Sequence, residues 1–384
     1  VKPVHLPNVT GYLIAGLIIG PYCLGIFQES DAAVTDVLTD VALGFIAFSI
    51  GGEFRISNIK QIGTSSITIT FFQACLATLL VDAALLACGF PAPLSLTLGA
   101  IAAATAPAAT LMVVRQYHAK GEVTSTLLPV VAMDDAVGLM LFSIFLPISQ
   151  ALASNAALTV TSMLLQPLLE IVLSLAVGAG IGLLIALAMR FFHSKVNRIS
   201  VAVAAVLLGS ALASIWNLSS LLLCMAIGAV LVNLRNDADE LLEITDAWTP
   251  PLFMLFFVLS GAELDLAVVP TVGLLGVVYM VARSLGKYFG SFLGATIAKS
   301  SPNIRKYLGL TLLPQAGVAI GMAQVALNAL PEYGTQIQAV VLTATLIYEL
   351  IGPVITKLAL TAAGEIQDSK KSKAKTEQSA GGAK

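Results

Sequence analysis

Two adjacent carboxylates interrupt an apolar stretch and are the residues best suited to chemistry. Asp134 and Asp135 lie in PVVAMDDAVGLMLFSIF, residues 129–145. Ionisable groups in such surroundings usually pair with one another or face water. Arg283 and Lys287 lie in another apolar stretch, four positions apart, and so share one face of a helix. We expect Asp134 to pair with Lys287 and Asp135 to stay free, because adjacent helix residues point in directions about 100° apart.

This arrangement predicts a carrier of protons and small cations. Burial beside a second carboxylate disfavours the charged form of Asp135, so this residue can exchange a proton near physiological pH. Na⁺ or Li⁺ can replace the proton, because hard cations prefer carboxylate, carbonyl and hydroxyl oxygens. Asp134 and Asp135 are thus the predicted metal ligands, and Thr105 adds a hydroxyl. Lys287 can release a proton when Asp134 takes the ion. The alternative is a buried ion-pair network that only pins two helices together.

Proline and glycine interrupt two apolar stretches, where they favour broken helices. The first break holds Thr105, Ala106 and Pro107, and the second holds Pro314, Gln315, Ala316 and Gly317. Unwound backbone at membrane depth is tolerated where it is buried in protein or lines a wet cavity, and paired breaks mark transporter binding sites. An ordinary proline kink at each place is the alternative. Arg283 could brace the second break or neutralise Glu53 or Glu263, whereas Gln73 and Asp82 are more typical of structural roles.

The elements that position these residues are predicted to be membrane helices. Of the 384 residues, 57% are hydrophobic and only 11% are charged, which predicts an all-α polytopic membrane protein. The net charge of −2 argues against nucleic-acid binding. Twelve spans are predicted, and their limits are 9–27, 32–54, 64–90, 94–116, 124–153, 160–192, 197–215, 219–234, 246–263, 267–298, 304–328 and 334–363. Residues 1–363 would form the transmembrane domain and residues 364–384 a disordered cytoplasmic tail.

Positive charge supports this map. All but two of the 20 Lys and Arg residues fall on one side of the membrane, the exceptions being Arg283 and Lys287. By the positive-inside rule that side is cytoplasmic, so both ends of the chain are expected inside the cell.

Three pairs of segments are similar at nearly constant offsets. GFIAFSIGGEFRI matches MLFFVLSGAELDL, LIAGLIIGP matches MAIGAVLVN, and ATAPAATLMV matches LLPQAGVAIG. The reference pairs are Glu53 with Glu263, Gly16 with Gly228, and Pro107 with Pro314. Spans one to five then repeat as spans eight to twelve in the opposite orientation, which is typical of transporters. A thirteenth span before Val1 would complete the first repeat.

In this order the motifs resemble those of bacterial monovalent cation/proton antiporters. LPNVTGYLIAGLIIGP, FSIGGEF, TAPAATLMV, the DD of AMDDAVGL, FFVLSGAELDL, RSLGKYFG and LLPQAGVAIG carry the resemblance over most of residues 6–363. The branch includes sodium/proton exchangers and potassium-efflux systems. PQAGVA replaces the PRGE-like sequence of some relatives, so their charged contacts there do not carry over.

The resemblance implies an inverted-repeat fold with two crossed broken helices and a homodimer in the inner membrane. It implies a panel (dimer) domain from 9–54 and 197–263, a core (transport) domain from 64–153 and 267–363, and a linker helix, 160–192. It further implies elevator-type exchange of Na⁺ or Li⁺ for H⁺ that is electrogenic, with Asp135 as carrier and Asp134 as partner of Lys287. No cofactor and no catalytic residue is expected.

Other classes of protein fit less well. An intramembrane aspartyl protease needs two aspartates facing each other from different helices, and here they are neighbours. A channel needs a filter-like segment, which is not evident. A K⁺/H⁺ antiporter of the potassium-efflux type and a sodium-coupled symporter of related fold stay open as alternatives. The symporter would not need Lys287.

Overall fold

The computed structural model is helical throughout the part of the chain that it describes. This part comprises residues 8–21, 23–26, 32–52, 54–106, 110, 113–114, 116–154, 166–192, 194–216, 218–235, 237–262 and 273–366. The helices are α1 (Asn8–Ile19), α2 (Ala32–Gly52), α3 (Ile56–Ala87), α4 (Ala92–Ala102), α6 (Glu122–Ala153), α7 (Gln166–Ala188), α8 (Lys195–Trp216), α9 (Ser220–Leu234), α10 (Ala238–Trp248), α11 (Pro250–Ala262), α12 (Gly273–Ile297), α13 (Pro302–Tyr307), the 3₁₀ helix η4 (Leu308–Leu312), α14 (Gly317–Ala329) and α15 (Gly334–Ala362).

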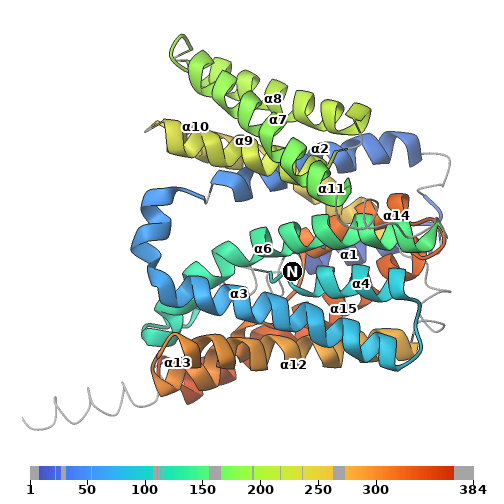
Figure 1. Cartoon of the computed structure of the whole chain (residues 1–384), viewed down its shortest axis with the longest axis vertical. Helices are drawn as coiled ribbons and strands as arrows, with labels where there is room; N and C mark the ends of the chain where they lie inside the picture. Colours follow the sequence, from blue (N-terminus) through green and yellow to red (C-terminus); the bar gives the residue numbers. More distant parts are fainter. Residues whose placement is uncertain are drawn as a thin grey trace, which may run out of the picture.

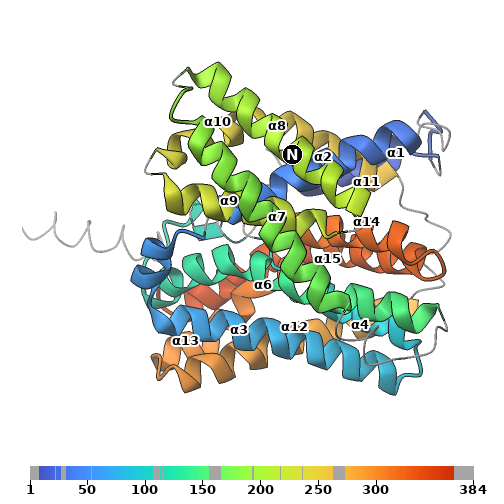
Figure 2. The same ribbon diagram turned by 45° about the horizontal axis from the view of Figure 1, so that its top comes forward.

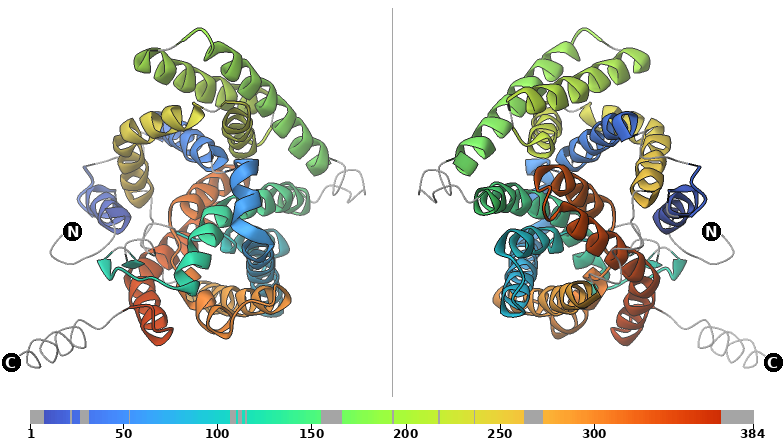
Figure 3. Two further views of the ribbon diagram at one scale, coloured as in Figure 1. Left: turned by 90° about the vertical axis from the view of Figure 1, so that its left-hand side faces the viewer. Right: turned by 90° about the vertical axis from the view of Figure 1, so that its right-hand side faces the viewer.

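The helices form two groups. One group contains α3, α4, α6 and α12 to α15, and the other contains α1, α2 and α7 to α11 (Figure 1). The two side views in Figure 3 show the groups next to each other, and in the turned view of Figure 2 α7 runs across from the second group towards the first. In the first group α3 lies along α12, and in the second α2 lies along α9 and α1 along α11.

The helices overlap every predicted span. Among the described residues, five helices are long and apolar enough to cross a membrane, and the bent pair Pro302–Leu312 and Gly317–Ala329 makes a sixth. Large apolar side chains on the outer faces are exposed, for example Phe71 at 57%, Leu184 at 63% and Leu274 at 66%. Exposed apolar surface of this kind marks contact with a membrane. The count of twelve spans and the assignment of panel and core domains stay predictions.

Two close helix contacts are related to each other by the same offsets as the matched sequence segments. A Cβ on Gly16 would lie 1.9 Å from the carbonyl oxygen of Val258, and a Cβ on Gly228 would lie 2.1 Å from that of Phe48. These two contacts are related by offsets of 212 (228 − 16) and 210 (258 − 48), the offsets of the matched sequence segments. A two-fold axis that relates the two halves of the chain replaces each residue of one contact by its counterpart in the other. The packing therefore supports the repeat.

Some boundaries differ from the prediction. The span predicted as 94–116 has its first helix, α4, end at Ala102, because the chain unwinds through residues 103–106. The amphipathic helix α10 was not predicted. Its sequence, ADELLEITDAW, mixes acidic and apolar residues. Its Trp248 packs edge-on against Phe45 of α2, with 5.1 Å between ring centroids.

The C-terminal end also differs. The tail was predicted from residue 364, but Glu365 lies against the start of α6, where its carboxylate accepts hydrogen bonds from Val123 and Thr124. Residues 367–384 lie outside the described part of the chain.

Candidate functional site

The two broken segments meet in the first group of helices. The backbone N–H of Ala106 donates a 2.9 Å hydrogen bond to the carbonyl oxygen of Pro314. The hydroxyl of Thr110 donates to the carbonyl of Thr311 at 3.1 Å. The second segment bends by 48° between its two helical parts. Both predicted breaks are therefore joined to each other through their own backbone.

Glycine permits the second break. Gly317, the first residue of α14, has a φ of +35°, in the left-handed region that side chains disfavour. The preceding residue, Ala316, is extended. Gln315 is fully buried and donates from Nε2 to the carbonyl of Ile101 at 3.1 Å, so it ties this break to the end of α4. The Gln315 amide also shares hydrogen bonds of 2.8 and 3.2 Å with the hydroxyl of Tyr279 on α12.

Lys287 and Asp134 form an ion pair in the middle of the first group. Lys287 Nζ lies 2.8 Å from Asp134 Oδ2, and both side chains are fully buried. Nζ also donates to the hydroxyl of Thr105 at 2.8 Å and to the carbonyl oxygen of Ala103. The other oxygen of Asp134 accepts a hydrogen bond from the amide of Gln73 on α3. A buried charge is tolerated when its partners are this complete, because an unpaired one costs several kcal/mol.

Asp135 differs from its neighbour. Its side chain is 8% exposed, and its Oδ1 atom has no hydrogen-bond partner among the described residues. The charges of Asp134 and Lys287 and the backbone of Thr105 lie close enough to interact electrostatically with its carboxylate. Asp135 is therefore a carboxylate at the crossing of the breaks with capacity to bind another group.

Arg283 binds the unwound backbone of both breaks. Its guanidinium donates to the carbonyls of Ala102 at 3.1 Å, Ala104 at 2.7 Å and Leu313 at 2.7 Å, with a longer 3.5 Å contact to Pro314. The guanidinium carbon lies 4.6 Å from the centre of the Tyr348 ring, a cation–π distance. The bracing expected for the second break therefore extends to the first.

Three predicted site residues, Pro107, Glu53 and Glu263, lie outside the described residues. Gln73, for which the sequence favoured a structural role, is the partner of Asp134, and Tyr279, the partner of Gln315, was not predicted. A lone amide in the apolar run FFQACLA was the available signal for Gln73. Within the described ranges, no group of three or more His, Cys, Asp and Glu side chains could hold a metal ion.

Comparisons with known proteins show the family and the fold of this chain. The model of the transmembrane sodium/hydrogen exchanger family matches residues 1–362. The chain belongs to that family and is an integral membrane protein. Its fold is that of the sodium proton antiporter MjNhaP1 from Methanocaldococcus jannaschii, of which the structure at pH 8 gives a TM-score of 0.71 at 22% identity, with 94% of each chain covered. A second structure, from an electron-microscopy map of the same antiporter, gives a TM-score of 0.72 at 20% identity.

Two relatives are similar in sequence. The chain is 27% identical over 280 residues to a protein named putative K⁺ efflux antiporter KefB from Alkalimonas amylolytica. The matched region covers 70% of this chain and 40% of that protein. The chain is 28% identical over 191 residues to Na⁺/H⁺ antiporter 1 from M. jannaschii, which covers 48% of this chain and 42% of that protein. The matched regions thus span less than half the length of either relative.

Proposed function

We propose that this protein is a secondary active antiporter that exchanges Na⁺ or Li⁺ for H⁺, with Asp135 as the carrier of ion and proton. The observation that carries the proposal is the unpartnered Oδ1 of Asp135, buried where the two breaks cross. A buried oxygen without a partner is costly unless it binds something. Membership of the exchanger family supports the same reading.

The coupling follows from charge. With a proton on Asp135 and the Asp134–Lys287 pair intact, the site is neutral. When a monovalent cation takes the place of that proton and draws on Asp134, Lys287 loses its partner and releases its own proton. The cation-loaded site then carries one negative charge. The protein would move two protons for each cation, and transport would be electrogenic.

The two groups of helices suggest how the ion crosses. We assign α3, α4, α6 and α12 to α15 to a mobile transport unit, because the crossing breaks and all the buried charges of the site belong to it. The group with α1, α2 and α8 to α11 would be the fixed unit, through which two copies form a homodimer, and α7 would link the two. The membrane is the inner membrane, with the C-terminus cytoplasmic.

Exchange by purified protein in liposomes tests the proposal. An imposed pH gradient and an internal pH dye report proton movement when Na⁺, Li⁺, K⁺ or choline is added outside. We expect movement with Na⁺ and Li⁺ but not with choline, and its loss in Asp135→Asn. Asp82→Asn is the control, because Asp82 is another buried carboxylate with an unpartnered oxygen and should retain exchange. Retained exchange in Asp135→Asn would refute the assignment of the carrier.

Potassium is the second candidate cation. The relative from A. amylolytica is named a putative K⁺ efflux antiporter, and this match covers 70% of the chain. Carboxylate, hydroxyl and carbonyl oxygens accept K⁺ as well as Na⁺. A proton response to K⁺ alone in the same assay would replace Na⁺ by K⁺ without changing the carrier.

A further inference from the structure

A polar pocket lies where the two groups of helices meet, away from Asp135. Its volume is about 240 Å³, and it is enclosed by residues of α6, α7, α9 and α14 together with Leu218 and Ser219 before α9. Its polar lining consists of Ser143, Gln150, Glu170, Ser219 and Ser220. We call this pocket the outer vestibule.

The vestibule holds a carboxylate that the proposed exchange has not used. Glu170 lies near the start of the apolar helix Leu168–Ala188, at the end opposite to Arg190. Because basic residues mark the cytoplasmic side, Glu170 is on the other side of the membrane. Among the described residues no basic side chain forms an ion pair with Glu170. The ion pairs in this part of the chain involve Asp134, Asp237 and Glu240. An ionisable group within a span marks a functional site by default.

Hydroxyl groups line the same pocket as this carboxylate, and hydrogen bonds of serine residues connect three helices there. The hydroxyls of Ser143 on α6 and Ser219 before α9 lie 3.2 Å apart. The backbone N–H of Ser219 donates to the hydroxyl of Ser174 on α7 at 3.1 Å, and that hydroxyl donates to the carbonyl of Glu170 at 2.6 Å. Carboxylate, hydroxyl and amide oxygens are the ligands that hard cations prefer.

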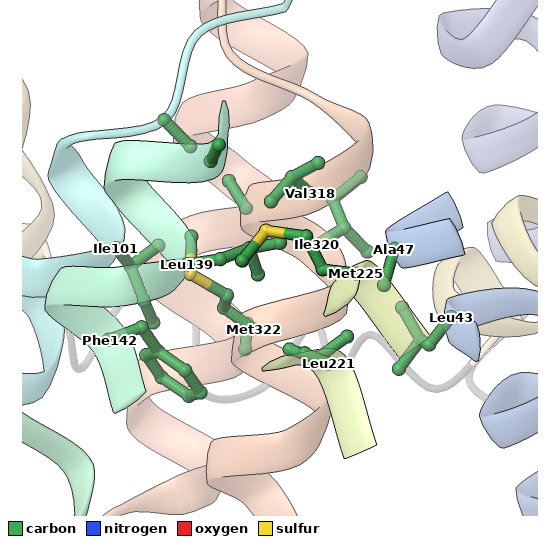
Figure 4. Close-up of a cluster of buried hydrophobic side chains, with 14 of the residues drawn as sticks. Leu43, Ala47, Ile101, Leu139, Phe142, Leu221, Met225, Val318, Ile320 and Met322 are labelled. Carbon is green, nitrogen blue, oxygen red and sulfur yellow. The ribbon is translucent and has the colours of Figure 1, made fainter. Parts of the chain in front are cut away.

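The inner wall of the vestibule is apolar. Phe142 and Leu221 line it and also belong to a cluster of buried side chains that includes Leu139, Met225 and Ile320. Figure 4 shows these side chains meeting from α6, α9 and α14, with Leu43 and Ala47 of α2 beside them. Leu139 follows Asp135 by one helical turn, and Phe142 follows it by seven residues, about 10 Å along α6. Along α6, Leu139 of this cluster therefore lies between Asp135 and the vestibule.

We propose that the outer vestibule binds the transported monovalent cation on Glu170 before the cation reaches Asp135, and that the apolar cluster is the closed barrier between them. The proposal rests on the antiport function proposed above. The cation keeps part of its water, since a volume of about 240 Å³ has room for several water molecules beside it. Such a site binds weakly, which lets the ion move on when the helices shift.

The first test compares the two faces of the membrane. Right-side-out vesicles present the outer face to added Na⁺ and everted vesicles present the cytoplasmic face. Glu170→Gln should raise the apparent KM for Na⁺ about threefold to fivefold in right-side-out vesicles only, the size expected for one solvent-screened charge pair. The maximal rate should stay unchanged, and Glu170→Asp should restore the wild-type KM.

Glu332→Gln is the matched control, because Glu332 is an exposed carboxylate that lines a different pocket at the start of α15. An equal KM shift in this control, no shift in Glu170→Gln, or a shift confined to everted vesicles would overturn the proposal. Asp135→Asn abolishes exchange on both faces if the antiport function holds. Exchange that survives in that variant refutes Asp135 as the carrier, and wild-type protein without cation-dependent proton exchange refutes the antiport function, whatever Glu170→Gln does.

A second test needs no transport. In a protein whose exposed Cys23 and Cys88 are replaced by Ser, a cysteine in place of Ser220 should react with a membrane-impermeant maleimide added outside. A cysteine in place of Ala47, which is fully buried in the apolar cluster, should not react. Reaction of the first only from the cytoplasmic side, or of neither, would overturn the vestibule; reaction of Ala47→Cys from outside would overturn the barrier.

Discussion

Removal of the Glu365 carboxylate should destabilise the helix that carries Asp134 and Asp135. Glu365 lies just after α15, and its two oxygens accept hydrogen bonds from the first turn of α6. Oε1 accepts from the N–H of Val123 at 2.6 Å, and Oε2 accepts from the N–H and the hydroxyl of Thr124 at 2.8 and 2.7 Å. The helix N-terminus has unpaired N–H groups and a partial positive charge, so a carboxylate there acts as a cap.

The magnitude follows from burial. Loss of a capping group costs about 0.5–2 kcal/mol when water replaces it. Val123 is fully buried and Thr124 is 6% exposed, so water reaches these donors poorly and the upper end of that range applies. Glu365→Ala should therefore lower the free energy of unfolding by about 2 kcal/mol. Gly121→Ala should act in the same direction, because its Cβ would lie 2.3 Å from the carboxyl carbon of Glu365.

Reversible unfolding in mixed micelles of detergent and SDS measures this free energy. Glu122→Gln is the control, since Glu122 is an exposed carboxylate in the same first turn and should change stability by at most about 1 kcal/mol. A double-mutant cycle with Thr124→Val should give a coupling of at least about 1 kcal/mol, the worth of a hydrogen bond to a charged group. An additive cycle, or a loss no larger than in the control, would refute the capping argument.

Three further outcomes are expected. Lys287→Met should cost about 3–5 kcal/mol, because it leaves Asp134 charged and buried, and Asp134→Asn in the same protein should recover most of the loss; unfolding of the single and double variants decides this. Gly290→Ala should cost about 1–3 kcal/mol, because its Cβ would lie 2.6 Å from the Cα of Gln73 across α3, while Gly276→Ala on the same helix meets nothing within 4 Å and should not destabilise. Hydrogen bonding from Arg235 lowers the pKa of Asp237, so this carboxylate contributes stability above its unfolded pKa of about 3.9, and this contribution is lost as pH falls through the lower folded value. Asp237→Asn should destabilise at pH 7; the difference from wild type should begin to shrink below about pH 4 and disappear below the folded pKa.

Some features of the site could be predicted because they are local in sequence. Proline and glycine mark the breaks, and the tendency of ionisable groups in apolar stretches to pair predicts Asp134 with Lys287. The hydrogen bond of Gln73 to Asp134 and the four carbonyls bound by Arg283 could not be predicted. They depend on how far side chains extend from one helix to another. The same holds for Glu365, whose carboxylate contacts a residue 242 positions earlier. Helix α10 was missed because eleven residues with a mixed polar face resemble a loop in composition.

The packing of helices that are distant in sequence also determines when the protein can assemble during synthesis. The close contact of Gly16 with Val258 joins residues 242 positions apart (258 − 16), and the contact of Gly51 with Met225 joins residues 174 apart (225 − 51). A ribosome adds about 5–20 residues per second, so α1 waits between about 12 and 50 s for α11. During that time its glycine surface faces lipid or a chaperone. Assembly is therefore late and dominated by distant contacts, and chains that stop before α11 leave α1 without the helix along which it packs.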